Sequence, residues 1–518
     1  MSAGGEQPLR RSFGAVPVEE RPGGERHVEL RVWAPSVRSL AVDLPGGRYE
    51  LADTGDGVYE ALVPAGAGDE YLLVVDGEES YPDPCSRAQP HGVRGPSAVV
   101  DTGAFAWTDE GWEGVPLDDL VIYELHVGTF TEEGTFGAAI PRLRALRDLG
   151  VTAIELMPVA TFPGERGWGY DGLYAHAPHR AYGGPEGLAR LVDAAHAAGL
   201  AVLLDVVYNH VGPGNEALRA FAPYFTSKHE TFWGDAIDYE QAGVREWAIQ
   251  NAELWVRDYH IDGLRLDAVH AIFDDSPQHI CAELAARVRD ASPRALVISE
   301  MAVDDWRPID EWGHDAQWAD STHHHLHALL TGEQEGYYEG YGSLALLGED
   351  LQGQGRDPRR LVVCAQNHDQ VGNRAVGDRL PPDALRVAAA VTLFSPCTPL
   401  LFMGEESLAA SPFQFFTDHI DLSIADATRE GRRREFEAFT SFSGEGVPDP
   451  QSVETFRRSK VPSGKPDPLY RELLALRRDL PRDLSVEVDE DAKVLRLRRG
   501  SVELVADFQA KQVDIRRP

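Results

Sequence analysis

Hydrophobic and polar residues alternate along the first part of the chain. Four such segments, at residues 28–35, 39–51, 57–63 and 69–78, are separated by turns rich in Gly, Pro and Asp. This alternation is typical of strands that bury one face, and many short strands with frequent turns are typical of sandwiches. We therefore predict that residues 1–105 form an N-terminal β-sandwich module.

The pattern changes after residue 105, where apolar strand-like runs alternate with helical segments. That order is typical of parallel strands joined by crossover helices. Eight candidate strands, of which the one at 314–318 is the weakest, follow one another at residues 121–130, 152–159, 201–210, 263–270, 295–300, 314–318, 361–369 and 399–406. Their number and spacing predict an α/β fold, a (β/α)8 TIM barrel, over residues 106–480.

One predicted crossover helix, at residues 277–292, shows how the units are built. Pro277 stands at its start, and Ile280, Leu284 and Val288 follow at intervals of four. Proline is favoured in the first turn of a helix, and this interval places the three apolar side chains on one face. We expect that stripe to lie on the barrel wall.

The last barrel helix is predicted at residues 468–480, and alternating residues beyond it predict a small C-terminal β domain at 481–518. A doubly wound sheet is the alternative architecture. Such a sheet would normally carry a glycine-rich phosphate turn after its first strand if it bound a nucleotide, and residues 121–137 contain none.

Composition narrows the range of partners and compartments. The formal net charge of −35 opposes binding to nucleic acid, which depends on clustered Lys and Arg. The N-terminus lacks the apolar core of a signal peptide, and the apolar segment 387–403 is interrupted by Pro396 and Pro399. The four cysteines fit neither a metal site nor a disulfide framework: Cys85, Cys281, Cys364 and Cys397. We expect a soluble cytoplasmic protein without a nucleic acid or membrane partner, and the sequence gives no indication of its oligomeric state.

Polar and ionisable residues stand at the ends of most predicted strands. In Arg265 and Asp267, for example, a charge pair occupies one face of an otherwise apolar strand, and burying charges costs several kcal/mol unless partners compensate. In TIM barrels the active site lies at the carboxyl ends of the strands. The strand ends that we expect to converge there carry Glu124, His126, Asp205, Asn209, His210, Arg265, Asp267, His270, Glu300, His368, Asp369, Glu405 and Glu406.

Three of these carboxylates, Asp267, Glu300 and Asp369, follow the fourth, fifth and seventh predicted strands. Two carboxyl groups on either side of a bond are the minimal machinery of glycoside hydrolysis. A third would raise the pKa of at least one of them. Arg265 favours the ionised form of Asp267, which leaves Glu300 as the proton carrier.

Other chemistry is open at this point. The same three carboxylates could hold a divalent metal, although Trp168 and Tyr170 after the second strand favour sugar rings, which stack on aromatic side chains. His323 and His327 stand four apart in "THHHLH" and could share a helix face as metal ligands. We favour a polar surface helix or loop there.

Four motifs then match a known family in order and spacing. "DVVYNH" (205–210), "GLRLDAVH" (263–270), "VISE" (297–300) and "QNHD" (366–369) resemble the four signature regions of the α-amylase family, glycoside hydrolase family thirteen. The resemblance extends over about residues 20–510, because the leading β module is similar to that of the branching and debranching enzymes. Within the family, "YELHVGTFTEEGTF", "QNHDQVGNRAVGDRL" and "PFQFFTDH" resemble the branch that acts on malto-oligosyltrehalose.

The resemblance implies a substrate, an activity and a set of site residues. The substrate would be malto-oligosyltrehalose, cleaved with retention at the α-1,4 bond next to its terminal trehalose. Asp267 would be the nucleophile, Glu300 the acid and then the base, and Asp369 the third carboxylate. Substrate contacts would come from Tyr170, His210, Arg265, His270 and His368.

The resemblance implies neither a cofactor nor a metal. One departure from the family's common pattern is the segment "EMAVDD" at 300–305, near the expected contacts to the leaving trehalose. A glycogen branching or debranching enzyme, with the same machinery and other acceptor loops, is an alternative. A non-catalytic glycan-binding barrel protein is another.

Overall fold

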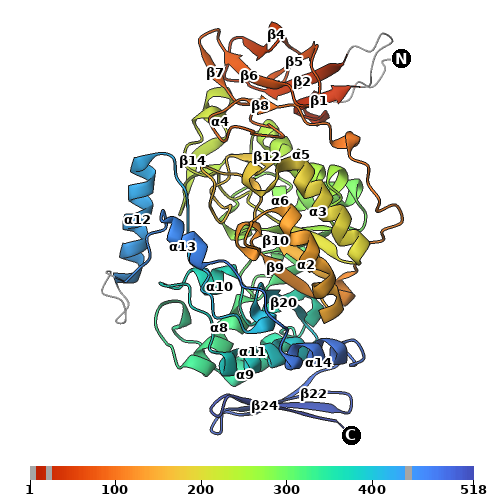
Figure 1. Ribbon diagram of the computed structural model, residues 1–518, viewed down its shortest axis with the longest axis vertical. Helices are drawn as coiled ribbons and strands as arrows, with labels where there is room; N and C mark the ends of the chain where they lie inside the picture. Colours follow the sequence, from red (N-terminus) through yellow and green to blue (C-terminus); the bar gives the residue numbers. More distant parts are fainter. Residues whose placement is uncertain (1–7, 19–25, 438–445, 518) are drawn as a thin grey trace.

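The computed structural model describes residues 8–18, 26–437 and 446–517. Three β structures lie one after another along the long axis of the molecule (Figure 1). An antiparallel sheet stands at the top, a closed parallel barrel with its helices fills the middle, and a four-stranded sheet lies at the bottom.

The N-terminal sheet has eight antiparallel strands in the order β1-β2-β5-β4-β3-β6-β7, with β8 paired to β6. Strand β4 pairs with β5 through Ala52 and Asp53 and with β3 through Gly47 to Leu51, so it joins the two halves of the sheet. The predicted segments are strands, with segment 39–51 divided into β3 and β4, and β1, β7 and β8 are additional. Their bounds are β1 Gly14–Val18, β2 His27–Trp33, β3 Leu40–Leu44, β4 Gly47–Asp53, β5 Val58–Val63, β6 Glu70–Val75, β7 Glu79–Tyr81 and β8 Ser97–Ala98.

The predicted barrel is confirmed as a closed ring of eight parallel strands in the order β10-β13-β16-β17-β18-β19-β20-β9. The weakest candidate, near residues 314–318, is β18, the sixth barrel strand in chain order. The bounds are β9 Ile122–Leu125, β10 Ala153–Leu156, β13 Ala201–Val206, β16 Gly263–Leu266, β17 Leu296–Ser299, β18 Ala316–Trp318, β19 Leu361–Cys364 and β20 Thr398–Phe402.

Helices follow the barrel strands and cover the ring. In α6 the predicted apolar stripe is present, since Ile280, Leu284 and Val288 are all buried, although the helix begins at Ile280, with His279 as its N-cap, rather than at Pro277. The main helices are α2 Phe136–Leu149, α3 Gly184–Ala198, α5 Ala242–Asp258, α6 Ile280–Ala291, α8 Asp320–Thr331, α9 Leu344–Leu351, α11 Pro382–Phe394, α12 Leu422–Glu437 and α14 Pro468–Arg477. Shorter helices are α1 Val127–Phe130, α4 Glu216–Phe221, α7 Arg307–Asp310, α10 His368–Gly372 and α13 Val453–Arg458.

The remaining strands form three smaller sheets. Two hairpins, β11 with β12 and β14 with β15, project from the barrel, and the C-terminal sheet has the order β21-β22-β23-β24. The bounds are β11 Ala160–Thr161, β12 Tyr174–Pro178, β14 Phe225–Thr231, β15 Gly234–Ile237, β21 Ser485–Asp489, β22 Val494–Arg499, β23 Val502–Asp507 and β24 Gln512–Arg516. We retain the domain boundaries after residues 105 and 480 as a proposal, and both fall between sheets.

The segment between the first sheet and the barrel is fixed to the barrel by a histidine. Both nitrogens of the buried His196 ring, at the end of α3, hydrogen-bond to carboxylates, Nδ1 at 2.8 Å from Asp109 Oδ2 and Nε2 at 2.9 Å from Asp262 Oδ2. Trp112 stacks on the same ring at 4.7 Å. Burial lowers the pKa of His196, but the two aspartates outweigh burial, and the net shift is upward.

The inside of the barrel is layered. Side chains that face inward from the lower part of the strands form an apolar cluster that includes Ile122, Ala153, Leu203, Ile298 and Leu400. Because side chains on a strand alternate in direction, the residues two positions further along also face inward. Those positions are polar on several strands.

Among the described residues, no helix is both long and apolar enough to cross a membrane.

Candidate active site

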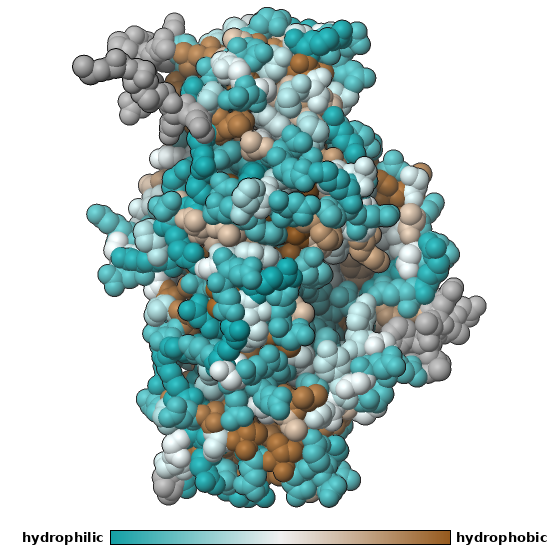
Figure 2. Space-filling view, turned by 180° about the vertical axis from the view of Figure 1, so that it is seen from behind, coloured by the Kyte–Doolittle hydropathy of each residue, from teal (hydrophilic) through white to brown (hydrophobic). Residues whose placement is uncertain are grey.

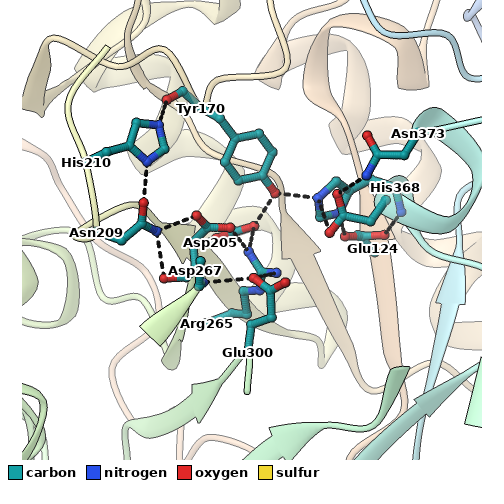
Figure 3. Close-up of polar contacts among 12 residues, drawn as sticks. Glu124, Tyr170, Asp205, Asn209, His210, Arg265, Asp267, Glu300, His368 and Asn373 are labelled. Atoms are coloured by element: carbon teal, nitrogen blue, oxygen red, sulfur yellow. Dashed lines mark hydrogen bonds and ion pairs between the residues drawn. The ribbon is translucent and has the colours of Figure 1, made fainter. Parts of the chain in front are cut away.

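Arg265 stands at the centre of the polar layer, where its guanidinium contacts three carboxylates (Figure 3). Nη1 donates to Asp205 Oδ2 at 2.8 Å and to Asp267 Oδ1 at 2.7 Å, and Nη2 donates to Glu300 Oε2 at 2.7 Å. Arg265 is fully buried, and Trp318 lies against it with 4.1 Å between Cζ and the ring centre. The guanidinium therefore holds two of the predicted catalytic carboxylates, those of Asp267 and Glu300, side by side.

The chain after β16 turns so that both of these carboxylates are fixed. Ala268 has φ 40° and ψ 52°, in the left-handed region that residues other than glycine rarely occupy. That turn directs the Ala268 N–H to Glu300 Oε2 at 2.8 Å. The second oxygen of Asp267 accepts from Asn209 Nδ2 at 2.6 Å. Backbone strain at such a position is typical of functional sites.

A hydrogen-bonded chain extends from Asp205 to the first strand of the barrel. The Tyr170 hydroxyl donates to Asp205 Oδ2 at 2.6 Å and lies 2.7 Å from His368 Nε2, while His368 Nδ1 lies 2.5 Å from Glu124 Oε1. Burial lowers the pKa of His368, but Asp369 and Glu124 outweigh burial and raise it to about 10. His368 is therefore an imidazolium at neutral pH, and both ring nitrogens donate. Burial also raises the pKa of Asp205, to about 7.

The three predicted catalytic carboxylates are more exposed to solvent than the buried residues Arg265 and Asp205 that adjoin them. The side chains of Asp267, Glu300 and Asp369 keep 10%, 19% and 28% of their surface exposed, whereas Arg265 and Asp205 keep 0% and 1%. A substrate can therefore reach the first three and not the last two.

A cleft of about 790 Å³ opens from Glu300 and Asp369 toward α8, α10 and α12. Its lining includes Glu300, Asp320, Asp369, Asn373, Tyr337 and Phe436. Figure 2 shows the surface hollowed on the side of the molecule where α12 lies. The volume is sufficient for several sugar rings, because ligand sites for drug-sized molecules span about 300–1,000 Å³.

Asp320 is a cleft residue that the sequence did not reveal. It is the first residue of α8, directly after the short strand β18, and it lines the cleft together with Glu300 and Asp369. Burial raises the pKa of Asp320 to about 7, and the charges of Glu300 and Asp369 add to the shift. The available signal was its position two residues after Trp318, at the end of a barrel strand.

The aromatic side chains that are exposed near the site differ from the one predicted after the second strand, Trp168. Trp168 is buried and stacks on Phe413 at 5.0 Å, so the prediction that it offers a face to sugar is wrong. Exposed aromatic residues that sequence reasoning missed include Trp233, between β14 and β15, and Tyr337 in the cleft. The Trp233 ring stacks on His210 at 4.4 Å with planes 4° apart.

The remaining predicted substrate residues divide into two groups. His210 belongs to the network: its Nε2 lies 2.9 Å from the Tyr170 carbonyl oxygen, and its Nδ1 contacts the Asn209 side chain. His270, in the turn Val269–Ala271, is exposed and outside this network. Its predicted substrate contact stays a prediction.

The acidic pair after the eighth strand does not join the site. Glu405 is buried and accepts from the Tyr470 hydroxyl at 3.1 Å and from the Phe402 N–H at 3.4 Å. Glu406 accepts from the Tyr123 hydroxyl at 3.0 Å. The expectation that every acidic strand end converges on the barrel mouth is therefore wrong for these two residues. Burial raises the pKa of Glu405 to about 8.

The histidine-rich segment is a buried helix, so its interpretation as a polar surface helix or loop is wrong. His323, His325 and His327 in α8 are all buried. His323 Nδ1 lies 2.7 Å from the Ala365 carbonyl oxygen, and the His327 ring stacks on Tyr338 at 4.0 Å. Within residues 8–18, 26–437 and 446–517, no group of three His, Cys, Asp or Glu side chains is arranged to hold a metal ion.

Comparison with known proteins gives consistent relatives. The sequence profile of the alpha amylase catalytic domain matches residues 103–233. A malto-oligosyltrehalose trehalohydrolase of Deinococcus radiodurans is 44% identical over 512 residues, which cover 91% of this chain and 84% of that protein. A crystal structure from Salmonella typhimurium, of a protein assigned to the α-amylases, is 37% identical with a TM-score of 0.87 and covers 96% of this chain and 92% of that one. A 1,4-alpha-glucan branching enzyme of Xanthomonas campestris is 32% identical over 303 residues, 52% of this chain and 41% of that enzyme.

Proposed function

This chain belongs to the malto-oligosyltrehalose trehalohydrolases, within the α-amylase family of glycoside hydrolases, and from that membership and the site geometry we propose its reaction. The enzyme hydrolyses the α-1,4 bond next to the terminal trehalose of malto-oligosyltrehalose. The products are trehalose and a shortened malto-oligosaccharide. The four cysteines are free and buried, which supports our proposal that it works in the cytoplasm.

In the proposed mechanism, a carboxylate oxygen of Asp267 attacks the anomeric carbon while Glu300 protonates the glycosidic oxygen, and trehalose leaves. The bonds from Arg265 and Ala268 both fall on Glu300 Oε2, so Oε1 is the oxygen assigned to carry that proton. Glu300 then takes a proton from water, which attacks the same carbon and releases Asp267. Two inversions give net retention, the outcome expected when the carboxyl groups lie close together.

The other groups of the site hold the sugar and the charges. Asp369, the most exposed of the three carboxylates, is assigned to hydroxyl groups of the reacting ring, and Asn373 Nδ2 donates to its Oδ1 at 3.1 Å. The imidazolium of His368 donates to Tyr170, whose hydroxyl in turn donates to Asp205. That order fixes the Tyr170 ring beside the nucleophile, where we propose that it stacks on the sugar.

The strongest support for a double-displacement hydrolase is the contact set of Arg265. One guanidinium contacts Asp267 and Glu300 through adjacent nitrogens, so the two carboxylates are held within the width of that group. A separation of about 5–5.5 Å belongs to retaining enzymes, whereas inverting enzymes need about 6.5–9.5 Å to admit a water.

One product analysis tests the proposal. Purified protein is incubated with maltopentaosyl-trehalose and, separately, with maltohexaose, and the products are separated by chromatography. We expect free trehalose from the first substrate and little hydrolysis of the second. Action on branched glucan without release of trehalose would instead favour the branching or debranching alternative, which a relative matching about half of this chain supports less well. An Asp267→Asn variant with the wild-type rate would show that Asp267 is not the nucleophile, and a wild-type protein that releases no product from any of these substrates would favour the non-catalytic alternative.

A further inference from the structure

The barrel interior holds an ionisable side chain that the proposed mechanism does not use, Glu155 on β10. It stands two positions after Ala153, a member of the inward apolar cluster, so it too faces the interior, and it is 0% exposed. Its neighbours in register are Glu124 on β9 and Leu203 on β13. Neither of its carboxyl oxygens has a hydrogen-bond partner among the described residues.

The surroundings of Glu155 disfavour its ionised form. Burial raises the pKa of Glu155 well above its ordinary value, and the charges of Glu124 and Asp205 raise it further. A protonated carboxyl group has one O–H donor and acceptor capacity on both oxygens. It can therefore bond an acceptor and a donor at the same time.

The surroundings of Glu155 supply one acceptor and one donor. Asp205 Oδ1 and Arg265 Nε are buried atoms without a partner in the described part of the chain, and both residues lie within electrostatic reach of Glu155. The opposite ends of these side chains are fully engaged, since Arg265 Nη1 bonds Asp205 Oδ2. Trp318, whose ring lies against the guanidinium, adds Nε1 as a further buried donor that has no partner among the described residues.

Unpaired polar atoms at this depth are costly, and proteins satisfy most of them. Buried waters typically make about three hydrogen bonds to such atoms. A carboxyl oxygen of Asp205, the N–H of Arg265 and the carboxyl group of Glu155 together offer that number. A metal cation in the same place is disfavoured because the neighbouring guanidinium of Arg265 is already positively charged.

We propose that Glu155 is a positioning residue, which together with internal water bound to Asp205 Oδ1 and Arg265 Nε forms a polar floor beneath the catalytic groups. The inference rests on the proposed function, because the floor matters through what Arg265 does for Asp267 and Glu300. A floor that fixes the lower edge of the guanidinium fixes the direction of Nη1 and Nη2, and therefore the two carboxylates that they hold. Glu155 itself touches no substrate.

The first test compares Glu155→Gln, which is neutral and keeps a donor and an acceptor, with Glu155→Leu, which keeps the size and loses both. We expect kcat for trehalose release to stay within about twofold in the Gln variant and to fall by about tenfold or more in the Leu variant, with KM little changed in both. Leu203→Met, which alters the same interior without a polar change, serves as the control and should keep its kcat. A Leu variant as fast as wild type, or a Gln variant as slow as the Leu variant, would overturn the proposal.

The second test needs no substrate, so it separates failure of this inference from failure of the proposed function and stands even if Glu155→Leu does not fold. Infrared difference spectra between wild type and Glu155→Gln at neutral pH should show the carbonyl stretch of a protonated carboxylic acid. A high-resolution crystal structure should show ordered water bridging Glu155, Asp205 Oδ1 and Arg265 Nε. An ionised Glu155, or a dry contact between these groups, would refute the water-bridged floor.

Discussion

Replacing Arg265 by methionine should destabilise the barrel strongly and in a pH-dependent way. Methionine keeps an unbranched apolar stem that can pack against Trp318, so the change removes the charge and its donors with little loss of volume. The carboxylates of Asp205, Asp267 and Glu300 then lose their shared partner.

The size of the effect follows from burial. Arg265 and Asp205 are 0% and 1% exposed, and removing one partner of a buried ion pair costs about 3–5 kcal/mol. The pKa of Asp205 is already raised to about 7 with Arg265 present, and it should rise further without that neighbour. A carboxyl group whose pKa is raised on folding loses stability as pH rises from its ordinary value through its folded value. We therefore expect the loss in Arg265→Met to be larger at pH 8 than at pH 5, where Asp205 can take up a proton.

Urea unfolding followed by tryptophan fluorescence at both pH values measures this. The double variant Arg265→Met with Asp205→Asn should recover part of the loss at pH 8, because the buried charge is gone. Arg31→Met is a matched control, since Arg31 is equally buried but pairs with Glu60, which is 29% exposed. A loss below about 1 kcal/mol at pH 8, or an equal loss at both pH values, would refute the assignment of Arg265 as the charge partner of the site.

Four further predictions concern single residues. Asp267→Asn should lower kcat by about 10⁴-fold or more with folding intact, as judged by product formation and circular dichroism, because it removes the nucleophile. Two flanking aspartates raise the pKa of His196 on folding. The stabilisation from protonated His196 is therefore complete at pH values below its ordinary pKa near 6.5, and it is lost as pH rises through the pKa of the folded state. The difference in unfolding free energy between wild type and His196→Gln should accordingly shrink from pH 6 to pH 9. The pKa of Glu405 is about 8, so wild type loses stability as pH rises from 4.5 through that value. The free energy of unfolding of Glu405→Gln, measured relative to that of wild type, should therefore be higher at pH 9 than at pH 5. Trp233→Ala should raise KM about tenfold while His210 stays in place, since an aromatic stacking contact is worth about 0.5–1.5 kcal/mol; an unchanged KM would mean that the exposed ring does not meet the substrate.

The sequence alone indicated the barrel and the positions of its polar residues, because strand ends are local features. An apolar run that stops at Asp205, Asp267 or Glu300 is visible in the sequence without knowing what lies beside it. The partner of each group depends on closure of the ring. That Arg265 contacts Glu300, 35 positions away, and that Ala268 donates to the same oxygen, followed only from the structure.

The failed predictions share a physical cause. The polarity of His323 and His327 predicts surface groups, yet a backbone carbonyl oxygen, a neighbouring carboxylate and an aromatic ring satisfy them inside the protein. Trp168 was taken as a sugar-binding surface because it precedes Tyr170 by two residues, but its ring packs in the core. In each case the residue type was compatible with burial once partners were supplied from distant segments.

The layering of the barrel explains how short strands can carry both the apolar core and the acidic groups of the site. On four strands an inward apolar side chain is followed, two positions later along the chain, by an acid: Ile122 by Glu124, Ala153 by Glu155, Leu203 by Asp205 and Ile298 by Glu300. The period of two directs these acids to the inside of the barrel, next to the apolar cluster. That proximity removes them from water and raises the pKa of Glu155 and Asp205, so the layer is stable only because Arg265 and its hydrogen bonds compensate. A one-residue shift of any of these strands would exchange its acid for an outward-facing side chain, which means that strand register, as much as residue identity, defines the site.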